Sequence, residues 1–275
     1  MKPFINMKHI IITIALALTT FGITSCNTNK VNEYELTCNV KSYTIKTYEI
    51  VSKFGEYCKG DINSSFESTN AIFEFTKDGL LKSKSDLEIR HGNFTGEIGG
   101  KDIYKYNKNN ELISEHSYYS NGSLMSYTLY EYDISGHCIC EKYYYNDNSL
   151  RWTVTYTYDN DRIIKLMHDE EPNIPDFGVF KKKIHESDYE ITYVYDDNGK
   201  HIKNIIHDFK TCTQEEKTYE YVFGDTNVEV NEYGLVTKID ELTFEYTYDN
   251  HHNWITKTTY KNTIPISIIE RDIIY

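Results

Sequence analysis

Hydrophobic and polar residues alternate with a period of two along most of the chain. In residues 104–107, 130–133 and 156–159, a tyrosine, a polar residue and a second tyrosine precede an Asn or Asp. Such alternation, ended by a turn-forming residue, is typical of a β-strand that enters a tight turn. From residue 34 onward no segment sustains hydrophobic residues at helical spacing. The pattern therefore predicts an all-β protein.

The pattern recurs at a regular interval, which predicts how the strands are connected. An aromatic residue ends a strand at positions 106, 119, 132, 145 and 158, each 13 residues after the one before. Two such steps make a repeat of about 26 residues, enough for a β-hairpin with strands of about nine residues and a short turn. We expect an antiparallel up-and-down meander of about 14 to 16 long strands, rolled or closed into a barrel-like sheet because an open one would expose long edges.

The turn after each Tyr-x-Tyr segment carries a characteristic residue. Four positions after the second aromatic, most copies have a residue type that tolerates the left-handed backbone conformation of a tight turn. Arg162 stands at this place in one copy, which is one residue short. The expected left-handed positions are Gly79, Asn110, Gly136, Gly199 and His252.

These segments resemble the YD or Rhs-type repeat, whose signature is Tyr-x-Tyr-Asp-x-x-Gly followed by a strand. Residues 130–136 and 193–199 match the signature in full, and residues 246–254 resemble its C-terminal variant with His252 in place of glycine. The resemblance spans roughly residues 70–275 and implies a large rolled antiparallel sheet, sometimes described as porin-like. The resemblance implies no particular activity. Large Rhs proteins carry a toxin domain after their repeats, and the resemblance does not imply such a domain here.

The first 26 residues have the features of an export signal. Two lysines precede a hydrophobic run at residues 10–18, which is too short to span a bilayer as a helix. Residues 23–26, Ile-Thr-Ser-Cys, resemble the lipobox of bacterial lipoproteins. That resemblance implies removal of residues 1–25 and lipidation of Cys26. Position 27 is Asn rather than the Asp that retains many lipoproteins in the inner membrane. The resemblance therefore also implies the outer membrane.

The repeats and the lipobox together resemble the YD-repeat lipoproteins of Gram-negative bacteria. We therefore expect a signal peptide at residues 1–25, a linker at 26–38 and a single β domain at 39–275. The protein would be anchored to the outer membrane by its lipid, on the periplasmic face or at the cell surface.

The charge of the chain limits its partners. The 29 Lys and Arg residues are outnumbered by 42 Asp and Glu residues, which gives a formal net charge of −13. Without a basic patch, the electrostatic attraction that supplies most nucleic-acid affinity is missing. Nucleic acid is therefore an unexpected partner, whereas an envelope glycan or protein is compatible with the composition.

Three long connections interrupt the regular repeats, at residues 55–68, 90–100 and 168–188. In a meander the turns alternate between two ends, so all three would lie at the end opposite the Tyr-x-Tyr-Asp turns. Elaborated loops on a rigid scaffold are common places for binding sites. The longest connection, residues 168–188, can alternatively be a charged, solvent-exposed loop without a binding role. The candidate binding residues of this rim are Arg90, His91, Phe94, Glu170, Glu171, Phe177, Lys181 and Lys182.

The sequence carries no catalytic signature that we can identify. Hydrolase, phosphate-binding and zinc motifs are missing, and Glu115 and Glu141 recur with the repeat rather than forming an acid–base pair. Asp249, His251 and His252 could ligate a metal but fit a solvated turn better. We therefore expect no enzyme activity, no metal and no cofactor.

The sequence thus predicts a lipid-anchored binding or structural module of the cell envelope, with glycan or protein binding at the long-loop rim. Two alternatives remain open. A glycan-directed envelope hydrolase would need two carboxylates about 5–10 Å apart at that rim. A transmembrane β-barrel would need an apolar band facing lipid, whereas here one strand face is tyrosine-rich and the other charged.

Overall fold

The computed structural model describes residues 35–36, 39–63, 69–170, 188–197, 199, 201–209, 211–218 and 228–275. The signal peptide, Cys26 and most of the linker lie outside these residues, as does the repeat copy at 219–221. The chain forms two compact units. The first comprises residues 1–28, 130–142 and 152–218, and the second comprises residues 29–129, 143–151 and 219–275. Each unit is described by itself.

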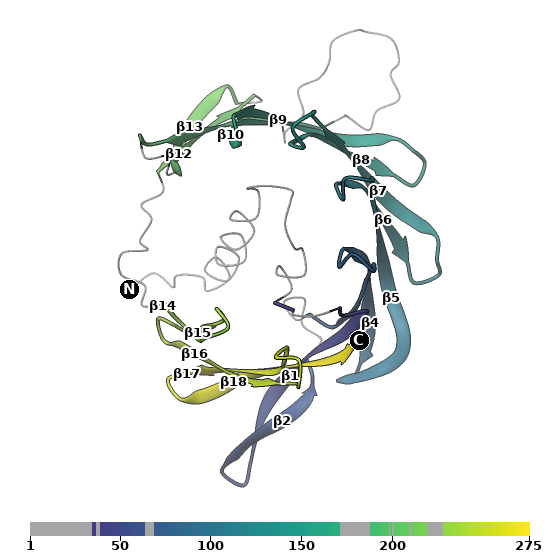
Figure 1. The fold of residues 1–275 in the computed structure, drawn as a ribbon, viewed down its shortest axis with the longest axis vertical. Helices are drawn as coiled ribbons and strands as arrows, with labels where there is room; N and C mark the ends of the chain where they lie inside the picture. The colour runs from purple at the N-terminus through teal and green to yellow at the C-terminus, as the bar shows by residue number, and fades with distance from the viewer. Residues whose placement is uncertain are drawn as a thin grey trace. The chain divides into compact units, whose positions relative to one another are not determined.

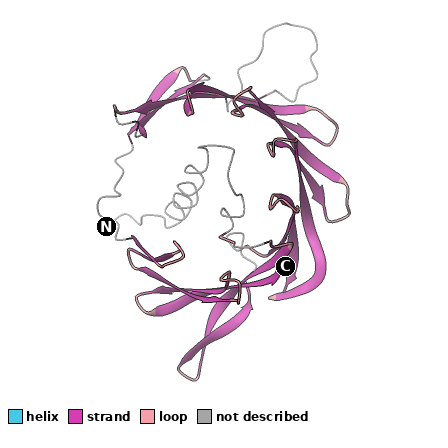
Figure 2. Cartoon of the chain, viewed as in Figure 1, coloured by secondary structure: helices cyan, strands magenta, loops and turns pink. Residues whose placement is uncertain are grey.

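The described residues form strands joined by turns (Figures 1 and 2). None of these residues belongs to a helix with the length and apolarity that a bilayer crossing needs. The strands are β1 Ser42–Lys53, β2 Glu56–Ile62, β3 Ala71–Phe75, β4 Leu81–Arg90, β5 Asn93–Tyr106, β6 Leu112–Tyr119, β7 Leu124–Tyr132, β8 Cys138–Tyr145, β9 Leu150–Asp159, β10 Arg162–Glu170, β11 Tyr189–Tyr195, β12 His201–Asp208, β13 Thr213–Thr218, β14 Val228–Val230, β15 Val236–Ile239, β16 Leu242–Tyr248, β17 Trp254–Lys261 and β18 Ile264–Ile274.

The predicted fold class is confirmed. Strands that follow one another in sequence pair in antiparallel registers, as in the β5–β6 and β6–β7 hairpins of the second unit and the β9–β10 and β11–β12 hairpins of the first. The described residues contain 18 strands, more than the 14 to 16 that the repeat predicts. The difference arises partly where two of the predicted loops are strands instead.

The predictions of loops at residues 55–68 and 90–100 are wrong over residues 56–62 and 93–100, and residues 64–68 lie outside the described structure. In the first, the chain reverses in two residues, so that β2 pairs with β1 and Lys53 lies opposite Glu56. In the second, β4 reaches Arg90 and β5 begins at Asn93. Strand pairing forms here because it satisfies backbone groups that a loop would leave to water. The third predicted loop lies mostly at residues 171–187, outside the described structure.

The Tyr-x-Tyr-Asp turns share one hydrogen-bond pattern that explains their signature. In the β7–β8 turn, Asp133 Oδ1 accepts the backbone N–H groups of Ser135 and His137, at 2.8 and 3.0 Å. The N–H of Gly136 donates to the Asp133 carbonyl at 3.1 Å. A carboxylate or amide oxygen at this position therefore replaces a backbone acceptor inside the turn. The same pairs of bonds to a side-chain oxygen recur at Asn107, Asn231 and Asp249.

The predicted left-handed positions are confirmed. The φ angles of Gly79, Asn110, Gly136, Gly199 and His252 are 74°, 65°, 86°, 79° and 64°. The short copy reverses through a two-residue turn instead, in which Asn160 has a φ of 54° and Arg162 already pairs with Asp159. Residues 228–234, Val-Glu-Val-Asn-Glu-Tyr-Gly, form a further copy that has valines in place of the tyrosines.

The second tyrosine of the signature links neighbouring hairpins. The hydroxyl of Tyr106 donates to the carbonyl of Leu81 at 2.9 Å, within the second unit. Within the first unit, Tyr158 and Tyr195 donate in the same way to the carbonyls of Cys138 and Ile163, at 2.8 and 2.7 Å. In each case the acceptor lies at the start of the strand that follows an earlier turn. The repeated tyrosines are half-buried and act as ties between repeats.

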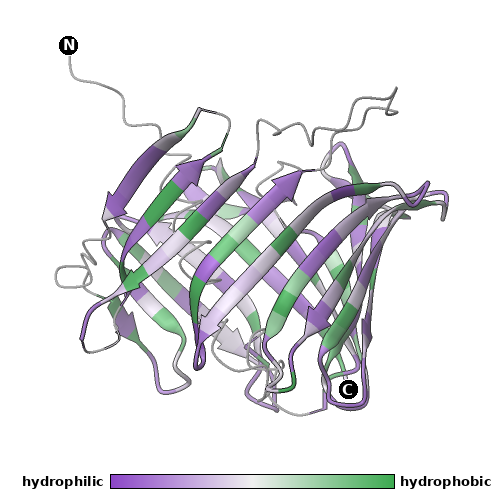
Figure 3. Ribbon diagram, turned by 90° about the horizontal axis from the view of Figure 1, so that it is seen from above, coloured by the Kyte–Doolittle hydropathy of each residue, from purple (hydrophilic) through white to green (hydrophobic). Residues whose placement is uncertain are grey.

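The main hydrophobic core belongs to the second unit, where one face of β1, β3 and β17 packs with Leu36 and Val40. Hydrophobic and hydrophilic positions alternate along single strands, as the pleat of a β-sheet requires (Figure 3). Tyr43 stacks on Phe73, with ring centroids 4.8 Å apart. The buried core residues are Leu36, Val40, Tyr43, Ile45, Ala71, Phe73, Phe75, Leu81 and Trp254.

Candidate functional site

The β1–β2 and β4–β5 hairpins end on the same side of the second unit. Both β1 and β4 are antiparallel to β3, so they run in one direction and end at Lys53 and Arg90. The N–H of Ile62 donates to the carbonyl of Gly92 at 2.8 Å, which ties the two hairpins together. Gly92 has a φ of 72°, and a Cβ there would lie 2.4 Å from the Cβ of Asp61, so only glycine fits this approach.

Exposed aromatic side chains lie at the turns of both hairpins. Phe54 and Tyr57 lie at the β1–β2 turn, which we call the hairpin-tip surface. Arg90, His91 and Phe94 lie at the β4–β5 turn, which meets β2 at Asp61 and Ile62 rather than at its tip. Phe54 is fully exposed, and Tyr57 and Phe94 also show large parts of their rings to solvent. Phe54 and Gly55 form the two-residue turn, with φ of 55° and 86°. Asn or Gly is preferred at such positions, so a phenylalanine there has a conformational cost with no burial to offset it.

The charged groups at the β4–β5 turn are already paired. Arg90 donates from Nε and Nη2 to Glu88 Oε1, at 3.0 and 2.5 Å, and Thr95 also donates to Glu88. The bond from Arg90 holds the pKa of Glu88 below its usual range. Lys46 lies over the Phe94 ring, 5.7 Å from its centroid. Glu88 is therefore a stable anion, which suits recognition better than proton donation.

The structure brings only part of the predicted rim together. Arg90, His91 and Phe94 lie together at the β4–β5 turn. Glu170, at the end of β10, is only 4% exposed, and its backbone N–H donates to Asp188 Oδ1 at 2.7 Å. The other four predicted rim residues, Glu171, Phe177, Lys181 and Lys182, lie outside the described residues.

The sequence patterns did not single out Phe54 and Tyr57. Their signal is the Phe-Gly pair between two alternating segments, which is compatible with a two-residue hairpin turn. The expectation of one continuous loop over residues 55–68 conceals this turn.

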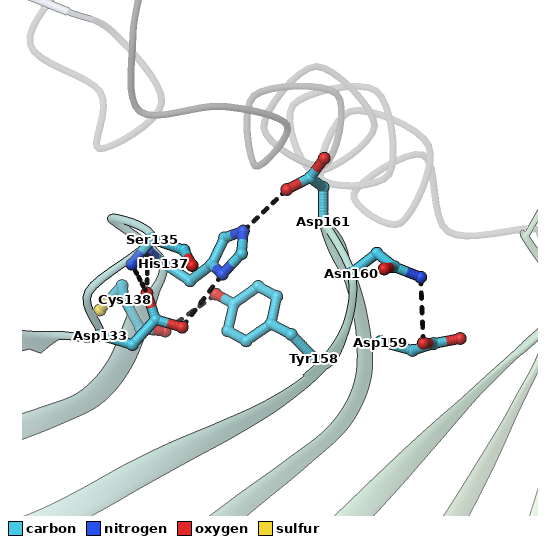
Figure 4. Close-up of polar contacts among 8 residues, drawn as sticks. All are labelled: Asp133, Ser135, His137, Cys138, Tyr158, Asp159, Asn160 and Asp161. Atoms are coloured by element: carbon cyan, nitrogen blue, oxygen red, sulfur yellow. Dashed lines mark hydrogen bonds and ion pairs between the residues drawn. The ribbon is translucent and has the colours of Figure 1, made fainter.

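A second polar cluster lies in the first unit, where the β7–β8 turn meets the β9–β10 turn (Figure 4). His137 Nδ1 lies 3.1 Å from Asp133 Oδ2, and its Nε2 lies 3.0 Å from Asp161 Oδ1. The imidazole stacks on Tyr158 with centroids 4.6 Å apart. We call this cluster the His137 clamp.

The bonding of the His137 clamp indicates a structural role. Hydrogen bonds from His137 to Asp161 and to Asp133 raise the pKa of the imidazole. Because both ring nitrogens face a carboxylate, neither is left to accept a proton from a substrate or to ligate a metal. Among the described residues, no three His, Cys, Asp or Glu side chains are grouped closely enough for a metal site.

The Asp249 turn uses its polar atoms in the same way. Asp249 Oδ1 accepts the backbone N–H groups of His251 and Asn253, at 2.8 and 3.0 Å, and Oδ2 accepts the hydroxyl of Tyr275. Burial acts to raise the pKa of Asp249, but these hydrogen bonds hold it below its usual range. His251 packs on the Tyr275 ring with centroids 4.0 Å apart. These contacts satisfy the turn without an ion.

No protein-family model and no curated protein matches this chain. Among solved structures, a porin-like protein from Bacteroides uniformis has 10% identity and a TM-score of 0.31, over 87% of this chain and 99% of that one. The crystal structure of TcdB2-TccC3-TEV has 17% identity and a TM-score of 0.36, over 70% of this chain and 13% of that one. The Tc holotoxin pore of Photorhabdus luminescens has 14% identity and a TM-score of 0.24, over 70% and 12%. At these TM-scores the matches carry no statement about function, and membership of the YD-repeat family stays a prediction.

Proposed function

We propose that this protein is a binding module of the cell envelope, anchored by a lipid at Cys26, which contacts an envelope protein through the hairpin-tip surface. The observation that carries the proposal is Phe54, a fully exposed aromatic at a backbone position of positive φ. A residue that is unfavourable both in its conformation and in its exposure is accounted for if a partner buries it.

A protein partner fits this surface better than a glycan. Phe54 has no polar atom, whereas sugar recognition combines ring stacking with hydrogen bonds. An exposed aromatic side chain at a hairpin turn, with Tyr57 close by on β2, resembles the anchor residues of protein interfaces, which fill an apolar pocket on the partner.

The test is photo-crosslinking in cells of the source organism. A photoreactive phenylalanine analogue replaces Phe54, and a second chain carries it at Ile134, which is also a fully exposed apolar turn residue. The proposal expects a discrete protein adduct from position 54 alone. Equal adducts from both positions, or capture only of purified envelope glycan by the 54 chain, would contradict it.

A substitution separates function from stability at the same position. Asn tolerates a positive φ better than Phe does, so Phe54→Asn should raise the free energy of unfolding by roughly 0.5–1 kcal/mol. Urea denaturation measures this change. The same change should abolish the adduct formed by a photoreactive residue placed at Tyr57. A destabilised Phe54→Asn chain would show that the ring packs within the protein, and an undiminished adduct would show that Phe54 is not the contact.

A further inference from the structure

A buried arginine in the second unit has hydrogen-bond donors that none of the described residues satisfies. The Arg271 side chain, on β18, is only 6% exposed. In the part of the chain that the structure describes, its Nε and Nη1 have no hydrogen-bond partner. The guanidinium lies over the ring of Trp254, 3.5 Å from the centroid, and 5.0 Å from the Tyr43 centroid. Packing therefore holds this cation against aromatic rings, and two of its buried donor atoms have no acceptor among the described residues.

A second cation shares this face of the sheet. Arg271 pairs with Ile45 in register, and Ile269, two residues earlier on the same face, pairs with Lys257. The Lys257 ammonium lies 4.7 Å from the Phe244 centroid and 5.6 Å from the Tyr246 centroid. Burial, with a smaller contribution from Arg271, lowers the pKa of Lys257. Two cations thus lie within an aromatic environment.

One carboxylate approaches them, and it is placed as a displaceable group. Glu35 Oε2 lies 3.9 Å from Arg271 Nη2, beyond hydrogen-bond distance, and accepts Trp254 Nε1–H at 2.6 Å. The Glu35 side chain is 41% exposed, so this edge of the cluster opens to solvent. Glu35 also has a φ of 54°, an unfavourable conformation for a glutamate. Glu35 therefore reaches Arg271 only at ion-pair distance and from an unfavourable backbone conformation.

Folding alone does not explain a charge at position 271. A buried cation with unmet N–H donors loses its hydration without recovering the hydrogen bonds. Replacement of buried ionic groups by hydrophobic side chains of similar volume is often neutral or stabilising. An arginine with open donors beside an exposed glutamate has instead the chemistry of a carboxylate receptor, because guanidinium and carboxylate pair through parallel hydrogen bonds.

We propose that Arg271, Lys257 and the Trp254 Nε1–H form a binding site for a small ligand carboxylate, which displaces the side chain of Glu35. The carboxylate hydrogen-bonds to Arg271 and to the indole N–H, and Lys257 supplies further positive charge. Glu35 is the internal competitor that occupies the site when no ligand is bound. The site is independent of the hairpin-tip surface and of its proposed partner.

The chain offers a direct reporter for this site. Its only tryptophans are Trp152 and Trp254, so Trp152→Phe leaves Trp254 as the single indole fluorophore. The full chain carrying this change is titrated at constant ionic strength with two carboxylate probes. These are glucuronate, with glucose as its neutral counterpart, and a tripeptide with a free C-terminus, with its C-terminal amide as counterpart. The proposal expects a saturable change in Trp254 fluorescence with one of the carboxylates and none with the neutral counterparts.

Variants in the same background separate this proposal from simple pairing of Glu35 with Arg271. Arg271→Met should weaken the affinity by at least about tenfold, the value of a charge-assisted hydrogen bond. Glu35→Gln should strengthen it several-fold, because it removes the competing charge. The matched control is Glu245→Gln, an exposed glutamate that accepts the Tyr260 hydroxyl, and it should leave the affinity unchanged. If Arg271→Met does not fold, Lys257→Met provides the second loss-of-charge variant.

Three results would overturn the proposal. The first is the absence of a saturable response to both carboxylates up to about 50 mM, an affinity too weak for a specific site. The second is a response of equal strength in the Arg271→Met and Lys257→Met chains. The third is a weaker response in Glu35→Gln, which would show that the glutamate supports the bound ligand rather than competing with it.

Discussion

Two planar basic side chains in this protein, His137 and Arg271, have opposite environments. Each stacks on an aromatic ring, His137 on Tyr158 and Arg271 on Trp254. His137 lies at two turns of the first unit and has a carboxylate at each ring nitrogen. Arg271 lies under a sheet face of the second unit and has one carboxylate at 3.9 Å.

The difference shows what each cation is suited for. Near solvent, Asp161 can approach His137 at little cost, since its own side chain stays 89% exposed. The resulting clamp joins two turns and leaves no donor open. At the buried Arg271, water does not replace a missing hydrogen bond. An unsatisfied N–H donor there has a higher free-energy cost than one near solvent, and this favours binding of an external anion.

The largest expected effect comes from removing Trp254, the aromatic ring next to the buried Arg271 guanidinium. Trp254→Ala should lower the free energy of unfolding by about 3–5 kcal/mol, because it removes a buried indole and leaves Arg271 without its stacking partner. Urea denaturation followed by far-UV circular dichroism measures this. Trp152→Phe in the first unit is the matched control and should change stability far less. A loss below about 1 kcal/mol from Trp254→Ala would mean that the core tolerates the cavity.

The next effect sharpens the contrast between the cations. Arg271→Met should leave the free energy of unfolding within about 1 kcal/mol of the wild-type value or raise it, because the buried charge contributes little to folding. His137→Gln should instead lower the melting temperature, because its carboxylate pairs are lost. Both are read from thermal unfolding at pH 6. Strong destabilisation by Arg271→Met would assign the guanidinium a structural role.

A smaller effect depends on pH. The pKa of His137 is raised above its ordinary value of 6.5 in the folded protein. Its contribution to stability is therefore fully present below pH 6.5 and is lost as the pH rises through the folded-state pKa. The stability difference between wild type and His137→Gln, at most about 1 kcal/mol for such solvent-screened pairs, should shrink between pH 6 and pH 9. A difference that grows with pH would contradict the clamp.

The smallest effect isolates one half of the clamp. Asp161→Asn keeps a hydrogen-bond acceptor but removes the charge of an exposed side chain, so we expect a stability change below about 0.5 kcal/mol at pH 6. The pKa of His137, followed by NMR titration, should fall measurably, since the bond to Asp161 is the main cause of its elevation. An unchanged pKa would assign the elevation to Asp133.

Sequence patterns predicted the all-β fold and the Tyr-x-Tyr-Asp turns well because the interactions that form these turns are local. Asp133 bonds to N–H groups two and four residues further along, and Gly136 needs its left-handed φ for the same reversal. Patterns failed at residues 56–62 and 93–100, where strands replace predicted loops. There the strand state depends on pairing with β1 and β4, which a local pattern does not reveal.

The sequence by itself thus determined the strand period, the turn positions and their left-handed residues, because each rests on groups within a few residues of one another. Only the tertiary structure decided which charges meet. His137 and Asp161 are 24 residues apart, and Trp254 and Glu35 are 219 apart. Strand register brings such residues onto one face or one turn pair, and burial then decides whether a cation is satisfied by its own chain or left open to a ligand.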